Sequence, residues 1–458
     1  MRPLESGYAN WSARDRSGSF GFRKPGHTKT RMDVSVVKLA TLRIPDDAGC
    51  DGCHVGLWKT REPWKTELAF MLFRTANMPR SHDCACLLML VICLAGYGVT
   101  QQNKQDQSDE AIQQCIRQHQ YDLANEGKTF LLNEARHASF FLLGELHGEN
   151  EIPALLRDLW PQMWQDGYRH IAAELSPWAA HQLEFVPADR QPKLATLWSK
   201  QEALFVHSVG ASQLVLWGCD MDEMQPQLLI LELAQANPAS PSLQRMVEIT
   251  KSGYQRSMAP ALLELMRGAG DIQDHPVNDV SLAGNIRETL QIESDRLNKE
   301  TKLPAQVRRE SLMKDLFLQH YWKSVSPESG DKVMLRFGRN HLHRGYDERG
   351  ISTLGNFVAE FAFSQHKTVF NLATFGAGGK ASLAGETWDA DERGDDPGFA
   401  FLASLARYSA TIIDLRPLRD VLHRIPNENR SPLQKRLVYW ADSYDAVLCY
   451  KNVTPLKQ

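Results

Sequence analysis

The chain has 458 residues, of which 43% are hydrophobic and 23% are charged. This composition is typical of a soluble globular protein and excludes a protein with many membrane spans, a collagen-like fibre and a wholly disordered chain. With 52 basic and 55 acidic residues the formal net charge is -3, so no basic field indicates nucleic acid as a partner.

The first part of the chain differs from the rest in charge and pattern. Residues 1–80 carry 14 Lys and Arg against 8 Asp and Glu, a sum of +6, whereas the remainder carries 38 against 47, a sum of -9. Residues 1–77 show no hydrophobic period. We interpret them as a disordered extension or as sequence upstream of the true start, which we place at Met78, with Met71 as the alternative.

An apolar run at Leu87–Ala95 follows. Its nine residues are too few for a membrane-spanning helix, which needs about 20, but they suit the core of a signal peptide. We therefore predict a signal peptide at 78–98 and export to the periplasm or the medium. The alternative is a membrane anchor formed by 84–99, which would be the only membrane contact.

The cysteines give little further guidance. Cys50 to His54 has the CxxCH pattern of covalent haem attachment, but it precedes the predicted export signal, and we do not expect haem there. Only three cysteines follow residue 100, which predicts no disulfide framework.

Residues 99–137 are interpreted as a linker and an N-terminal helix, and residues 138–458 as one α/β domain. Short apolar runs alternate with helical patterns there, which predicts a central, mostly parallel sheet flanked by helices. The expected strands are Ser139–Leu143, His170–Ala173, Gln213–Trp217, Val333–Phe337, Thr368–Leu372, Thr411–Leu415 and Ala446–Tyr450.

Two segments of this domain have distinct patterns. In 151–167 the apolar residues recur on one helical face, so that 140–174 is predicted to form a βαβ unit. Residues 221–325 contain five helical patterns and no strong strand. We interpret this segment as an inserted helical subdomain that forms a substrate lid. The alternative is a set of ordinary helices that cover the sheet.

The first motif with possible chemistry is the loop Gly144-Glu145-Leu146-His147-Gly148, which follows an apolar strand. Ligands of open α/β sheets bind at the carboxyl ends of the strands. There an imidazole beside a carboxylate can act as a general base or ligate a metal. The alternative is that both side chains only hydrogen-bond the loop or cap the helix.

Further polar residues follow other expected strands. Glu174 and Asp220 each come after an apolar run, with a helix-capping role as the alternative for Asp220. His341 and His343 follow 333–337, and His343 could instead lie on the surface. The spacing Gly338 to His341 repeats that of Gly144 to His147. The sequence thus predicts one cleft with Glu145, His147, Glu174 and His341, and with Asp220 and His343 as possible additions.

These segments resemble the erythromycin esterase, ChaN and TraB/Tiki superfamily over about residues 138–455, including a closing strand that begins at Tyr444-Asp445-Ala446. The resemblance to the esterases implies that Glu145 and His147 activate water without a metal, with Glu174 and His341 in support. In the Tiki group it implies a divalent metal on His147, Glu174 and His341. In the ChaN group it implies haem binding outside the cytoplasm.

The sequence departs from each group. The esterase loop usually has one more residue between its glutamate and histidine, and its late histidine pattern is not matched by 339–342. ChaN-like loops continue with paired histidines where this chain has Glu149 and Glu151.

The function we predict is an exported hydrolase that cleaves an ester, lactone or peptide-like bond of a small-molecule or peptide substrate, with or without a divalent metal. The alternatives are a non-enzymatic haem- or metal-binding protein and a scaffold without an active site. The sequence does not indicate an oligomeric state.

Overall fold

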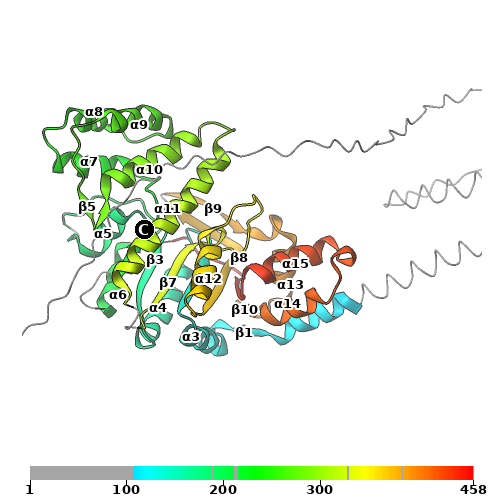
Figure 1. The fold of residues 1–458 in the computed structure, drawn as a ribbon. Coiled ribbons are helices and arrows are strands. Elements are labelled where there is room, and N and C mark those ends of the chain that lie inside the picture. The colour runs from blue at the N-terminus through cyan, green and yellow to red at the C-terminus, as the bar shows by residue number, and fades with distance from the viewer. Residues whose placement is uncertain (1–106, 188, 211–214, 327–329, 384, 457–458) are drawn as a thin grey trace, which may run out of the picture. The chain divides into compact units, whose positions relative to one another are not determined.

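The computed structural model describes residues 107–187, 189–210, 215–326, 330–383 and 385–456 (Figure 1). The expected extension 1–77, the expected signal peptide 78–98 and the CxxCH motif lie outside the described residues, and export remains a prediction. None of the helices in the described part is both long and apolar enough to cross a membrane.

The central sheet is mostly parallel, which confirms the predicted fold class. Within the described residues its strands follow the order β1-β10-β11-β8-β2-β7-β3-β4, with β9 paired to β8. The pairs from β11 to β4 along this order are parallel, and the pairs that involve β1, β10 or β9 as an added edge are antiparallel. The strands are β1 (Gln120–Asp122), β2 (Phe140–Glu145), β3 (Tyr168–Ala173), β4 (Leu216–Gly218), β7 (Lys332–Gly338), β8 (Val369–Leu383), β9 (Glu386–Asp391), β10 (Ala410–Asp414) and β11 (Ala446–Tyr450).

The innermost strands are buried on both faces. In β2, Phe141 and Leu143 pack in one apolar cluster, and Phe140 and Leu142 pack in another on the opposite face. A strand that is covered on both sides needs an unbroken apolar run, which is why the sequence pattern located it.

Helices cover the two faces. The first cluster includes the apolar face of α4 (Glu151–Gln165), and the second includes residues of α11 (Lys302–Ser324) and α12 (Leu354–Ser364). The other helices around the sheet are α3 (Lys128–His137), α5 (Pro177–Phe185), α6 (Lys200–Gly210), α13 (Pro397–Leu405), α14 (Arg416–His423) and α15 (Pro432–Ser443).

The chain between β4 and β7 is mainly helical. It contains α7 (Pro226–Ala236), α8 (Pro241–Thr250), α9 (Ala259–Gly268) and α10 (Leu282–Asp295), which share an apolar cluster of their own and lie together in Figure 1. The long helix α11 then leads from this group to the sheet. A short antiparallel pair, β5 (Pro276–Val277) and β6 (Val280–Ser281), interrupts the segment that we expected to lack strands.

Other departures from the sequence prediction have simple causes. The segment 99–137 also supplies β1, whose three residues are too few to show a period. β8 continues past Leu372 through Gly376, Gly378 and Gly379, which are residues that disfavour a strand prediction. β9 is largely polar because it pairs only with this extension of β8.

Glu149 is a buried carboxyl group that predicts a pH dependence of stability. Glu149 is only 2% exposed, and neither oxygen of its carboxyl group has a hydrogen-bond partner among the described residues. Burial, together with the charge of Glu392, raises the pKa of Glu149 from 4.5 to about 9. The folded state therefore holds a proton that the unfolded state releases above about pH 4.5, and stability is lost as the pH rises toward 9.

We expect Glu149→Gln to remove this loss. The variant should exceed the wild type in free energy of unfolding by about 1–3 kcal/mol at pH 8 and should differ little at pH 4.5, since one pKa unit corresponds to about 1.4 kcal/mol. Urea denaturation at both pH values measures this. The substitution of an exposed residue, Glu386→Gln, is the control. If the variant and the wild type differ in free energy of unfolding by the same amount at pH 8 and at pH 4.5, the prediction is wrong.

Candidate active site

The predicted polar residues meet at one edge of the sheet. β2, β7, β3 and β4 are parallel neighbours, so their carboxyl ends lie side by side. Glu145 ends β2, Glu174 directly follows β3, and Asp220 lies two residues after β4. His341 ends the turn η3 (Arg339–His341) that follows β7. The structure thus brings together Glu145, His147, Glu174, His341 and Asp220.

His147 lies between two carboxylates. Its Nδ1 is 3.2 Å from Oε1 of Glu145, and its Nε2 is 3.4 Å from Oε2 of Glu174. Burial alone would lower the pKa of His147, but the charge of Glu174 and the hydrogen bonds to both carboxylates raise it from 6.5 to about 10. The ring is therefore an imidazolium at neutral pH, with 29% of its side chain exposed.

Two glycines explain the repeated GxxH spacing. A Cβ atom on Gly338 would lie 2.9 Å from Nε2 of His147, and a Cβ atom on Gly144 would lie 2.8 Å from Cβ of Arg339. Each glycine thus leaves room for a residue of the other motif. The two tetrads recur because the two loops pack against each other where their strands end.

Glu174 is the residue that the others surround. Its Oε1 accepts a hydrogen bond from Nη2 of Arg309 at 2.8 Å and is 3.5 Å from Nε2 of His341. Its Oε2 accepts from the backbone N–H of Gly338 at 2.7 Å, in addition to the contact with His147. Burial opposes the charge, but His341 and His147 hold the pKa of Glu174 well below its usual range.

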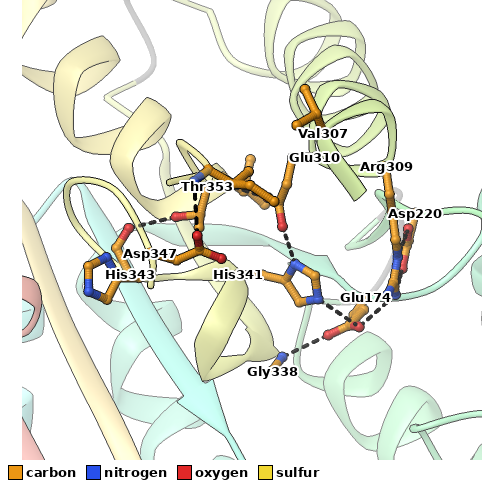
Figure 2. A network of polar contacts seen from close by, with 12 residues as sticks. Glu174, Asp220, Val307, Arg309, Glu310, Gly338, His341, His343, Asp347 and Thr353 are labelled. Atoms are coloured by element: carbon orange, nitrogen blue, oxygen red, sulfur yellow. Dashed lines mark hydrogen bonds and ion pairs between the residues drawn. The ribbon is translucent and has the colours of Figure 1, made fainter. Parts of the chain in front are cut away.

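His341 is oriented from its other side by Glu310 of α11. The Nδ1 atom of His341 is 2.6 Å from Oε1 of Glu310 (Figure 2). The other oxygen, Oε2 of Glu310, accepts from the backbone N–H of Leu354 at 2.9 Å. Burial lowers the pKa of His341, but Glu174 and Glu310 outweigh it and raise the pKa.

Asp220 is held by Arg309, the residue before Glu310 in α11. Nε of Arg309 donates to Oδ1 of Asp220 at 3.1 Å, and Nη2 bonds Oδ2 (Figure 2). The backbone N–H of Met221 also donates to Oδ1. Burial raises the pKa of Asp220 to about 6, against the opposing effect of Arg309. Asp220 does not cap α7, because Gln225 occupies the N-cap position of that helix.

Arg309, Glu310 and Arg336 were not predicted from the sequence. In α11, Ala305, Arg309 and Met313 are buried at helical spacing. Two charged residues, Arg309 and Glu310, therefore interrupt the apolar face of this helix, and this interruption was the sequence signal that could have indicated a polar site. Arg336 lies inside the apolar strand β7, where a buried cation needs anionic partners.

Arg336 has those partners. Its Nε is 2.7 Å from Oε2 of Glu145, its Nη1 is 2.5 Å from Oε1 of Glu202, and its guanidinium covers the ring of Trp198. Opposite charges therefore alternate through the site, in the order Glu202, Arg336, Glu145, His147, Glu174, Arg309 and Asp220.

The structure does not bring His343 to this group. Its Nε2 contacts Oγ of Ser443, and its ring lies 4.5 Å from that of Tyr439, on the far side of η3 from Glu174 (Figure 2). It is also buried, so the expected surface position is wrong as well. Burial lowers the pKa of His343 to about 4, which leaves the ring neutral.

A cavity of about 140 Å³ opens onto the cluster. His147, Glu174, Asp220 and Arg309 line it on one side. The rest is mixed, with apolar atoms supplied by Leu175, Ala179, Leu197, Met221, Met224 and Leu383. A water molecule takes about 30 Å³ of liquid volume, so this space accommodates a few waters or a small part of a substrate.

The donor set does not fit the metal that the resemblance implies. A carboxylate has about four lone-pair positions, and those of Glu174 face four nitrogen atoms, from Gly338, Arg309, His147 and His341. The guanidinium of Arg309 also places a positive charge where a cation would bind. Among the described residues, no group of three or more His, Cys, Asp or Glu is arranged to hold a metal ion.

A comparison with solved structures matched several chains at low identity. A protein from Bacillus cereus is 12% identical, with 76% of this chain and 99% of that chain covered and a TM-score of 0.49. An erythromycin esterase variant in its open conformation is 14% identical, with 73% and 95% covered and a TM-score of 0.47. ChaN of Campylobacter jejuni, described with cofacial haem, is 15% identical, with 57% and 89% covered and a TM-score of 0.27.

An erythromycin esterase and ChaN, two of the protein types to which the sequence motifs were similar, are thus among the matched structures. At this identity the likeness concerns the fold alone. No protein-family model and no curated protein sequence matches this chain.

Glu310 offers a test of how His341 is held. A glutamine at this position can bond both partners in only one orientation. Its oxygen accepts from the backbone N–H of Leu354, and its NH₂ group donates to Nδ1 of His341, so that Nδ1 must lack a proton. We expect Glu310→Gln to lower the pKa of His341, as measured by NMR titration of its imidazole nitrogens. The exposed Glu360→Gln on α12 is the control. An unchanged His341 titration would mean that Glu310 does not set its protonation.

Gly338 tests the packing of the two loops. Because a methyl group there meets Nε2 of His147 at 2.9 Å, Gly338→Ala should displace the ring and cost about 1–3 kcal/mol of stability. The control is Gly268→Ala, where an added Cβ meets nothing within 4 Å. Thermal unfolding of both variants is the measurement, and equal losses would argue against close packing at Gly338.

Proposed function

We propose that the protein is a metal-independent hydrolase that cleaves an ester, lactone or peptide-like bond in the cavity beside His147. The observation that carries this proposal is the placement of one partly exposed imidazolium between two carboxylates on the wall of a cavity. A fixed, protonated ring of this kind can donate a hydrogen bond to a carbonyl oxygen on which negative charge develops.

The proton on His147 changes the role that the sequence analysis gave it. With a pKa of about 10 the ring is already protonated at neutral pH, so it acts as a hydrogen-bond donor and not as the base. Asp220, with a pKa of about 6, is ionised at neutral pH and still basic enough to accept a proton. It lines the same cavity.

The reaction then balances within these residues. Asp220 takes a proton from water as the hydroxyl oxygen attacks the carbonyl carbon. Nε2–H of His147, which also faces Glu174 at 3.4 Å, stabilises the negative charge that forms on the carbonyl oxygen. When the tetrahedral intermediate collapses, the leaving oxygen or nitrogen takes the proton from Asp220. Glu145 and Glu174 keep the imidazolium oriented throughout.

The remaining residues support this arrangement. Arg309 holds Glu174 and Asp220 at a fixed separation, and His341 completes the shell of donors around Glu174. Since Arg309 belongs to α11, the helical segment between β4 and β7 borders the cavity, which supports a role as a lid over the substrate.

The haem-binding alternative gains no support from the histidines. A haem iron needs an unprotonated ring nitrogen. Both ring nitrogens of His147 and of His341 face carboxylates, and Nε2 of His343 contacts Ser443.

The two roles predict a bell-shaped pH profile. For the full-length protein, kcat/KM toward p-nitrophenyl acetate should rise through about pH 6, as Asp220 ionises, and fall through about pH 10, as His147 loses its proton. A single limb that rises up to pH 10 would instead make His147 the base.

Substitutions separate the two limbs. We expect His147→Gln and Asp220→Asn each to lower kcat about 10²- to 10⁴-fold, and Asp220→Asn to remove the acidic limb. Glu386→Gln, on the exposed strand β9, is the control. Wild-type turnover in His147→Gln, with the fold verified by circular dichroism, would overturn the proposal.

A further inference from the structure

A second cavity, of about 350 Å³, lies beyond η3 from the active site. Its walls come from η3 and the loop after it, from β8, from the turn η4 (Glu392–Gly394) and from α13 and α15. None of the residues of the proposed catalytic group lines it. The proposed function therefore leaves this cavity without a role.

The charges in this cavity do not cancel. Three arginines form ion pairs in the wall: Arg339 with Glu392, Arg349 with Asp347, and Arg436 with Asp396. Two further carboxylates line the cavity. Glu348 shares Arg436, and no side-chain contact of Asp395 is found among the described residues. His343 is neutral, since its pKa is about 4. Five carboxylates against three guanidinium groups leave a net charge of -2.

Aromatic rings supply the apolar part of the wall. Phe375 and Phe399 are stacked with their centroids 4.0 Å apart, and Tyr439, Trp440 and Tyr444 lie close by. Cations already lie over these rings: the guanidinium of Arg339 is 4.5 Å from the centroid of Phe375, and that of Arg436 is 4.4 Å from that of Tyr439. Such rings attract positive charge through their negative faces.

We propose that this cavity binds an organic cation, a ligand with an ammonium group on an aromatic or aliphatic body. The body lies against the aromatic side chains of the wall, and the ammonium group pairs with Asp395 and shares Glu348 with Arg436. An anion of the same shape should bind more weakly, because the excess negative charge of the cavity repels it. A purely apolar ligand leaves Asp395 without a cationic partner.

Isothermal titration calorimetry of the full-length protein tests this proposal. The probes are 2-phenylethylammonium and 3-phenylpropionate, which share a phenyl group and a short chain but carry opposite charges. We expect the cation to bind at one site and the anion to bind at least about tenfold more weakly. No heat with the cation, or equal affinity for both probes, would overturn the proposal.

Variants locate the site. Glu348→Gln combined with Asp395→Asn should weaken binding of 2-phenylethylammonium about tenfold, because each exposed ion pair contributes up to about fivefold. The matched control, Glu386→Gln with Glu428→Gln, removes the same charge outside the cavity and should leave affinity unchanged. His147→Gln should also bind the cation normally. Equal weakening by both double variants would mean a non-specific response to net charge, and loss in His147→Gln would place the cation in the active site.

Discussion

The buried carboxylate of Glu174 is the constraint on which the site depends. Four nitrogen atoms from four separate segments face its two oxygens: the loop after β2, the end of β7, the turn η3 and the helix α11. A buried carboxylate is costly unless cations and hydrogen bonds compensate it. The charge of Glu174 therefore fixes where His147, His341 and Arg309 lie relative to one another.

The alternation of charge continues outward from this residue. Glu145 is neutralised by His147 and Arg336, and Arg336 in turn by Glu202 of α6. On the other side, Arg309 joins Glu174 to Asp220. Because each member is balanced by its neighbours, the proton of His147 is stabilised without an external ion. The helical segment takes part in this balance through α11, so it is a component of the site as well as a neighbour of it.

The sequence predicted the parts of this arrangement that local patterns encode. The seven expected strands correspond to β2, β3, β4, β7, β8, β10 and β11, because apolar runs mark strands that are buried on both faces. Strand-end placement correctly grouped Glu145, Glu174 and Asp220. It failed for His343, because a residue two positions past His341 faces the opposite side of η3. Arg309 and Glu310 were missed because no local pattern indicates which residues of a distant helix reach a strand end.

The interlocked glycines of the two loops have a consequence for protein engineering. Gly338 makes room for His147, and Gly144 makes room for Arg339, so neither loop has a shape of its own that is independent of the other. A graft of the Gly144–Gly148 loop alone into another protein with this sheet would meet whatever side chain stands opposite it there. The smallest unit that can be transplanted is the pair of loops together.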